Sequence, residues 1–228
     1  VANCRTVLLR TARERAGDKC AEYLLSASSH LARILKSLER ETSLDILRGM
    51  EGEAARAYFS VFDNLILTQK EDFYFTERSR RPPLDNLNAM LSFIYTLLAH
   101  DVSSALEGVG LDPAVGFLHR DRPGRQGLAL DIMEEFRPFL ADRLVLSLVN
   151  RQQVKSKSFH KTETGAVMMD DKTRKEVLVS YQKRKQEEIT HPFLGEKVAV
   201  GLLPHCQAML LARYLRGDMD GYPSFIYR

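Results

Sequence analysis

Three acidic side chains stand at a spacing that could bind a metal ion. Asp131, Glu134 and Glu135 fall within about a quarter of a helix circumference, at roughly 100° per residue. Three like charges this close repel each other unless a cation offsets them. An acidic face opposite an apolar face is usually just solvated, however, so this pattern alone leaves both interpretations open.

An arginine-rich loop comes shortly before these acids. It contains His119 together with Arg120, Arg122 and Arg125. A lone histidine near a loop is most often structural or merely exposed. One with arginines around it and acids on its C-terminal side is a better candidate for a metal ligand.

A further carboxylate interrupts the apolar face of another predicted helix. That face consists of Leu44, Leu47, Ala54, Tyr58, Val61 and Leu65, spaced three and four residues apart. Glu51 fills the gap in this row, where an unpaired carboxylate would be costly to bury. It is flanked by Gly49 and Gly52, each costing ~1 kcal/mol in a helix relative to alanine, which predicts a close approach to the backbone. Pairing with a core arginine is the alternative.

Two carboxylates from different helices and one imidazole form a plausible metal-binding set. Oxygen-rich sets suit Mg²⁺ or Mn²⁺, and the imidazole favours Mn²⁺. Zinc fits less well because no cysteine joins the group. Such an ion can activate a hydroxyl and stabilise charge on phosphorus, and the arginines could hold phosphate oxygens. The residues therefore predict metal-dependent phosphodiester chemistry.

The composition sets broad limits on the class of protein. The chain has 228 residues, 44% of them hydrophobic, enough for one large domain or two small ones. Its net charge of +3 is too small to indicate nucleic-acid binding without local clustering. Three scattered cysteines indicate a reducing cytosol, and we find neither a signal peptide nor an apolar run of ~20 residues. The missing initial methionine predicts a fragment.

Helical elements are predicted to position the candidate site. The hydrophobic periodicity predicts helices at about residues 13–40, 42–69, 85–107, 127–150, 171–188 and 195–217. Thr42 and Asp45 form a capping-box signature, and Pro138 predicts a bend beside the acids. Residues 158–171 are the only stretch expected to form a hairpin, and residues 5–10 lean towards β structure. The predicted fold class is all-α.

Three motifs together resemble a known family. They are LRGMEGEAARAYF around Glu51, RSRRPPLDNLNAMLSFIYTLL with Asn88, and GFLHRDRPGRQGLALDIMEEFRP with His119, Asp131 and Glu134. The chain resembles the universal CRISPR adaptation integrase, a metal-dependent DNA endonuclease that joins protospacer 3′-hydroxyl ends to the CRISPR repeat. The ending THPFLGEKVAVGLLPHCQAMLLARYLRGDMDGYPSF, residues 190–225, is similar to the version found in type I-C systems.

The resemblance implies roles for individual residues. Glu51, His119 and Glu134 match the family's metal ligands, and Asp131 would be a fourth catalytic acid. The arginines expected to touch DNA are Arg78, Arg120, Arg122, Arg125 and Arg137. Separately from the resemblance, Asn88 lies on the apolar side of its predicted helix, which predicts an interhelical hydrogen bond, with a DNA contact as the alternative. Gly127 stands where relatives usually have serine, which predicts a weaker helix start.

The resemblance also implies a domain plan and partners. Residues 13–228 would be the helical catalytic domain, and residues 1–12 the remnant of a connection to an N-terminal β-sandwich that this chain lacks. The partners would be double-stranded and branched DNA, a small ferredoxin-fold adaptation protein and a protospacer-processing nuclease. The full-length protein would be a homodimer in the prokaryotic cytoplasm. A metal-free DNA-binding subunit and a structural scaffold are the competing hypotheses.

Overall fold

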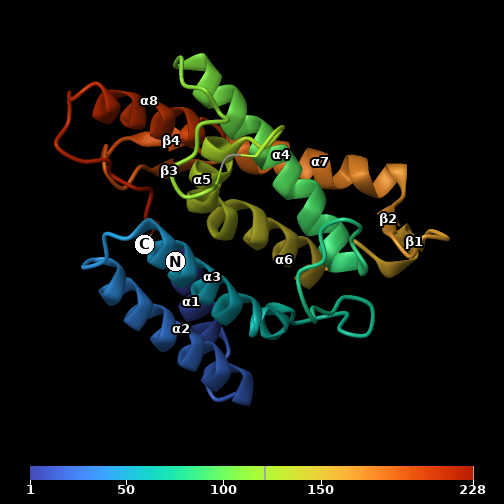
Figure 1. Ribbon diagram of the computed structural model, residues 1–228. Helices are drawn as coiled ribbons and strands as arrows, with labels where there is room; N and C mark the ends of the chain where they lie inside the picture. Colours follow the sequence, from blue (N-terminus) through green and yellow to red (C-terminus); the bar gives the residue numbers. More distant parts are fainter. Residues whose placement is uncertain (121, 228) are drawn as a thin grey trace.

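Helices form most of the structure, as predicted. The computed structural model describes residues 1–120 and 122–227 (Figure 1). The α-helices in this part are α1 Ala2–Glu14, α2 Lys19–Leu38, α3 Leu44–Phe59, α4 Asn86–Gly108, α5 Gly127–Phe136, α6 Arg143–Asn150, α7 Asp171–Gln186 and α8 Leu203–Leu215. Two antiparallel hairpins pair β1 Phe159–Lys161 with β2 Val167–Met169, and β3 Glu188–Thr190 with β4 Lys197–Ala199. The all-α prediction is confirmed.

The expected β character of residues 5–10 is wrong, because this segment lies within α1. Cys4, Val7 and Leu8 are buried, so a spacing of three and four residues places them on one helical face, which packs against α2. The helix predicted over 13–40 starts only at Lys19, after Gly17 with φ of 93°. Asp18 caps it by accepting a hydrogen bond from the Cys20 N–H. The domain role predicted for residues 1–12 stays a prediction.

Helix α3 is shorter than predicted at its C-terminal end. It ends at Phe59, and a 3₁₀ turn, Phe62–Leu65, follows. The Asn150 side chain fixes this turn, since its amide donates to the Leu65 carbonyl. The expected capping box is absent from the described residues. Instead, Glu41 Oε1 accepts hydrogen bonds from the N–H groups of the next two residues.

Helix α4 runs through the centre of the molecule and contacts α5, α6 and α8. Its bounds match the prediction, and Asp85 caps it by accepting from the Asn88 N–H at 2.7 Å. By length and composition alone it could cross a membrane, but the core helix of a soluble protein passes the same test. Ten of its residues are buried in this fold, which accounts for its apolar composition.

The bend predicted beside the acids takes the form of a π-helical segment. Between α5 and α6, residues Arg137–Asp142 form this segment, and Pro138 lies within it. Proline removes one helical N–H and crowds the preceding turn, so the regular ladder cannot continue through it. The change of pitch buries Arg137 and Asp142 on the core side.

The hairpin predicted at residues 158–171 is confirmed, but the expectation of no other is wrong. Strands β3 and β4 pair Ile189, which follows the end of the helix predicted at 171–188, with Val198, which lies within the helix predicted at 195–217. Gly195, with φ of 72°, lies in the connection and cannot be replaced there without strain. Helix α8 consequently begins at Leu203 rather than near residue 195.

The C-terminal segment returns to α1, so the marked chain ends lie close together (Figure 1). The Asn3 side chain joins them, because its amide donates to the Phe225 carbonyl and its oxygen accepts from the Tyr227 N–H. Phe225 is buried against Phe136 and Phe139. The C-terminal segment thereby packs against α5 and the π-helical segment that follows it.

Candidate functional site

A cavity of about 880 Å³ contains the three predicted metal ligands. Glu51 reaches it from α3, His119 from the loop before α5, and Glu134 from α5. The structure thus brings together side chains that are up to 83 residues apart in the chain (134 − 51 = 83). Asp131 is not among the described residues that line the cavity.

Asp131 instead holds His119 in place. Its Oδ1 lies 2.6 Å from His119 Nδ1, and its two oxygens also accept the backbone N–H groups of residues 117, 118 and 119. Burial would raise the pKa of Asp131, but the hydrogen bonds outweigh it and the pKa is lowered. The bond to Nδ1 leaves Nε2 of the imidazole as the nitrogen that can bind a ligand.

Burial and a neighbouring cation have opposite effects on the pKa of Glu134. Its side chain is 29% exposed, and Arg137 Nη1 donates to its Oε1 at 2.5 Å. Burial raises the pKa of Glu134, and the Arg137 guanidinium lowers it. The nearby Glu51 carboxylate raises this pKa further. The charge of Glu134 is thus disfavoured by burial and by a second carboxylate at the same cavity, and a divalent cation bound there would stabilise it.

Glu51 is partly buried, and no hydrogen bond or ion pair joins it to another described residue. The alternative in which it pairs with a core arginine is therefore wrong for the described part of the chain. The expected close approach to its flanking glycines is also absent there, because a Cβ at Gly49 or Gly52 would meet nothing within 4 Å. The carboxylate is available to a ligand within the cavity.

Glu51, His119 and Glu134 offer the types of donor atom that bind a divalent cation, but in the described structure they do not yet surround a common point. No group of three histidine, cysteine, aspartate or glutamate side chains in the described ranges is close enough to hold an ion as it stands. The two glutamates and His119 nevertheless line one cavity, and the histidine has the carboxylate partner that metal-binding histidines usually have. Oxygen donors with one imidazole suit Mn²⁺ or Mg²⁺.

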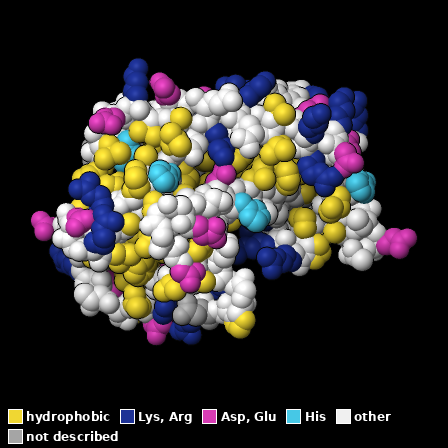
Figure 2. Space-filling view, turned by 90° about the horizontal axis from the view of Figure 1, so that it is seen from above, with side chains coloured by type: hydrophobic (Ala, Val, Ile, Leu, Met, Phe, Trp, Pro, Cys, Tyr) yellow, Lys and Arg dark blue, Asp and Glu magenta, His cyan; other side chains and the backbone are white. Residues whose placement is uncertain are grey.

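The five predicted DNA-contacting arginines divide into two groups. Arg78, Arg125 and Arg137 line the cavity. Arg122 lines a neighbouring hollow that shares Arg125, and Arg120 is exposed and pairs with Asp45 at 2.9 Å. Lysine and arginine side chains also gather in separate clusters on the face seen in Figure 2. Positive charge therefore borders the cavity locally, while the net charge of the whole chain stays small.

Asn88 has a different role from the expected interhelical hydrogen bond. Its side chain is fully buried and holds the segment that precedes α4. The Asn88 oxygen accepts from Arg78 Nη1 at 2.6 Å, and its amide donates to the Glu77 carbonyl at 2.8 Å. Arg78 also stacks over the ring of Tyr95. Asn88 thus positions Arg78 at the cavity wall.

A buried carboxylate behind the cavity was not predicted. Asp142 is fully buried and accepts hydrogen bonds from the hydroxyl groups of Tyr58 and Tyr95. Burial raises its pKa to about 6, although Arg137 and both tyrosines oppose the rise. Tyr95 also lines the cavity, so this network supports the wall that carries Arg137. The signal in the sequence is an acid that directly follows the apolar residues 139–141.

Two glycines allow the histidine loop to lie against the start of α5. A Cβ at Gly116 would lie 2.8 Å from the Gly127 carbonyl carbon, and one at Gly127 would lie 3.0 Å from the Ala114 carbonyl oxygen. Gly127 therefore has a packing role, beyond the weaker helix start that we predicted. The contact holds the loop that presents His119.

Glu135, the third acid of the predicted row, faces away from the cavity. It accepts hydrogen bonds from the Gln207 amide, the Tyr222 hydroxyl and the Phe225 N–H, at 2.8–2.9 Å. Burial raises its pKa, and these three donors oppose the rise. The acidic row thus splits, because Glu135 anchors the C-terminal segment while Glu134 faces the cavity.

Known proteins are similar to this chain in sequence and in fold. The chain matches the family described as "CRISPR associated protein Cas1" over residues 1–183. A relative from Chlorobaculum tepidum, named CRISPR-associated endonuclease Cas1 1, is 57% identical over 228 residues, covering 100% of this chain and 66% of the relative. A structure named "Casposase bound to integration product" has a TM-score of 0.80 at 25% identity, covering 100% of this chain and 62% of that one.

A second structure, named "Partial Cas6-RT-Cas1--Cas2 complex", has a TM-score of 0.83 at 23% identity, which shows a common fold; it covers 100% of this chain and 66% of that one. The chain spans about two thirds of the length of the Chlorobaculum relative. The type I-C assignment stays a prediction. From the family match and the sequence identity together, the chain belongs to the CRISPR associated protein Cas1 family.

Proposed function

We propose that this chain carries the catalytic site of a CRISPR spacer-acquisition integrase. The reaction joins the 3′-hydroxyl end of a protospacer to a phosphodiester at the border of a CRISPR repeat. The observation that carries the proposal is the single cavity lined by Glu51, His119 and Glu134 with arginines beside them. The names of the endonuclease relative and of the casposase structure support the same class of chemistry.

The proposed site residues have separate tasks. Glu51, Glu134 and the free imidazole nitrogen of His119 would hold Mn²⁺ or Mg²⁺. When bound, such an ion supplies activation of the attacking hydroxyl and stabilisation of charge on the departing oxygen. Asp131 keeps the imidazole in one tautomer through its bond to Nδ1. Arg137 offsets the charge of Glu134 when no metal ion is bound.

The proposed reaction is a direct transesterification. The protospacer 3′-oxygen forms a bond to phosphorus as the bond to the repeat-strand 3′-oxygen breaks. The proton of the attacking hydroxyl passes to solvent, and the departing 3′-oxygen takes up a proton from solvent to become a hydroxyl. Arg78 and Arg125 would hold phosphate oxygens at the cavity wall. If water attacks in place of the hydroxyl, the same site acts as an endonuclease.

The proposed partners follow from the family. Double-stranded and branched DNA would be the substrates, and the Cas2 named in the similar complex supports a small ferredoxin-fold adaptation protein as the partner. A protospacer-processing nuclease, a homodimer of the full-length protein and a location in the prokaryotic cytoplasm remain proposals.

A strand-transfer assay with Mn²⁺, using the full-length protein and its adaptation partner, tests the proposed function. Glu51→Ala should lower product formation by at least about 100-fold, because loss of the ion removes several kcal/mol of stabilisation. The matched control is Glu53→Ala, which changes a half-buried carboxylate of the same helix that pairs with His30. Equal product from the two variants would contradict the proposal.

The main competing function is a DNA-binding subunit that uses no metal. The lack of a ready metal-binding group among the described residues favours it. This hypothesis predicts that Glu51→Ala leaves both Mn²⁺ affinity and strand transfer unchanged. The two functions therefore give opposite results in the same assay.

A further inference from the structure

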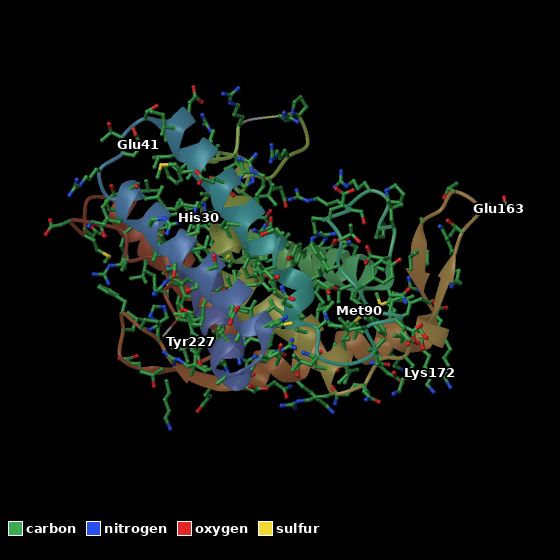
Figure 3. All side chains as sticks on the ribbon, turned by 90° about the horizontal axis from the view of Figure 1, so that it is seen from below. His30, Glu41, Met90, Glu163, Lys172 and Tyr227 are labelled. Carbon is green, nitrogen blue, oxygen red and sulfur yellow. The ribbon has the colours of Figure 1, made fainter. Side chains whose placement is uncertain are left out.

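A second cavity, of about 460 Å³, lies between α1, the π-helical segment and the C-terminal segment. It shares no lining residue with the first cavity. Three arginines line it, Arg10 and Arg13 of α1 and Arg143 of α6, and no described lining residue is acidic. Phe139 and Tyr227 provide an apolar wall, and Figure 3 labels Tyr227 on the segment that returns to α1.

Arg143 is the key residue of this second cavity. Its side chain is partly buried, and neither it nor Arg13 forms an ion pair with any described carboxylate. Burial lowers the pKa of Arg143, and the guanidinium groups of Arg10 and Arg184 lower it further. Arginine stays charged in proteins, so this cation is held among other cations at an energetic cost.

Further arginines add to the positive charge around Arg143. Arg10 and Arg13 are three residues apart and so lie on the same face of α1. Across the cavity wall, the Arg184 guanidinium stacks over Phe139, with its carbon 5.3 Å from the ring centroid. Arg10 and Arg184 have carboxylate partners in Glu14 and Glu187, which leaves Arg13 and Arg143 as the cations able to take an added anion.

We propose that this second cavity binds a phosphate group of the DNA backbone at a place separate from the catalytic cavity. Guanidinium groups match phosphate oxygens in a bidentate geometry, and an anion would remove the repulsion among the arginines. An aromatic wall beside the arginines suits the sugar and base attached to a phosphate better than a free ion.

DNA is the favoured source of the phosphate because a polymer with many phosphates can contact both cavities, which lie on two sides of one helical segment. Arg137 lines the first cavity and Phe139, two residues later on the same helical segment, lines the second. Residues two apart on a helix do not face each other, so the segment separates the two cavities. This choice rests on the proposed function, which already brings long DNA to the catalytic side.

The test is the salt dependence of binding to a blunt DNA duplex, measured with EDTA present so that no divalent ion is bound. Each phosphate contact contributes ~0.9 to the slope of log K against log salt. The double variant Arg13→Gln/Arg143→Gln should reduce that slope by roughly 1 unit, because both arginines hold the same phosphate. The matched control, Arg174→Gln/Arg216→Gln, removes two exposed arginines that pair with their own aspartates and should leave the slope unchanged.

A single variant tests the phosphate site without disturbing the fold, and a Tm measurement with inorganic phosphate distinguishes DNA from free phosphate. The single variant Arg13→Gln changes an exposed side chain, so the fold should persist, and the slope should fall by roughly 1. Inorganic phosphate should raise the Tm of the wild type and of the double variant equally. A larger rise in the wild type, with equal DNA slopes, would assign the cavity to free phosphate and overturn the proposal.

The remaining outcomes separate this proposal from the proposed function. If the wild type binds the duplex and the double variant has the slope of the control, the phosphate site is refuted, and an acidic protein segment becomes the alternative occupant. If the wild type does not bind DNA at all, the proposed function itself fails.

Discussion

At the scale of single residues, Asp131 controls the orientation of the proposed metal-binding histidine. Asp131→Asn would exchange one acceptor oxygen for an amide and disturb the bond to His119 Nδ1. We expect Mn²⁺ affinity, measured by isothermal titration calorimetry, to fall by roughly 10- to 100-fold. Asp112→Asn alters an aspartate that bonds only locally within the same loop and should leave the affinity unchanged. Equal affinities for the two variants would refute this role.

Asp142 should give the folded protein a characteristic pH dependence. Its pKa in the fold is raised to about 6, whereas an unfolded aspartate titrates near 3.9. The folded state therefore retains a proton that the unfolded chain loses, and the stabilisation is present below about pH 4 and lost as the pH rises through about 6. The loss is about 3 kcal/mol for a shift of this size.

Urea unfolding between pH 4 and pH 7 measures this contribution. Asp142→Asn should flatten the decline in unfolding free energy that the wild type shows over this range, because the amide does not titrate. Asp171→Asn, at a 91% exposed side chain, should follow the wild type. A decline as steep in Asp142→Asn as in the wild type would show that Asp142 does not cause it.

At the scale of elements, the backbone contact between Gly116 and Gly127 holds the histidine loop against α5. Gly116→Ala would place a Cβ 2.8 Å from backbone, so the loop must shift, and we expect a loss of roughly 1–3 kcal/mol in unfolding free energy. Gly49→Ala, in the open interior of α3, should gain up to about 1 kcal/mol. Urea unfolding measures the change in unfolding free energy of both variants, a decrease for Gly116→Ala and an increase for Gly49→Ala. A Gly116→Ala variant as stable as wild type would contradict the close packing.

The elements differ in how far the sequence predicts them. Helix α4 follows its periodicity and its Asp85 cap closely, because both are local signals. Pro138 is also a local signal, and the regular α-helix gives way to a π-helical segment at this residue. The β3–β4 hairpin was missed because its strands are three residues long, and periodicity cannot detect so short an alternation. The α1 helix was misread because its β-branched residues favour strands, whereas packing against α2 decides its structure.

At the scale of the whole molecule, Glu135 connects α5 to the C-terminal segment. Glu135→Ala would leave the Gln207 amide, the Tyr222 hydroxyl and the Phe225 N–H without this acceptor, at a cost on the order of 3 kcal/mol. Urea unfolding should show this loss, while Mn²⁺ affinity stays at the wild-type value. Glu107→Ala, on the exposed side of α4, is the control. An unchanged unfolding free energy for Glu135→Ala would contradict the anchoring role.

The candidate site was only partly predictable, because it depends on long-range packing. The carboxylate of Glu51 stood out as a break in an apolar row, and His119 stood out by its neighbours. Sequence could not show that Asp131 bonds the histidine, or that Glu135 turns away, since both depend on how the loop and the C-terminal segment pack around α5. The buried Asp142 network and the second cavity likewise arise from contacts between distant elements.

The central claim is that Glu51, His119 and Glu134 share one divalent ion. Anomalous X-ray diffraction from crystals soaked in Mn²⁺ tests this most directly, because it locates the metal independently of activity. We expect one strong peak in the cavity, within about 2.0–2.4 Å of a carboxylate oxygen of each glutamate and of His119 Nε2. A cavity without a peak at saturating Mn²⁺, or a peak that contacts none of these three side chains, would contradict the account.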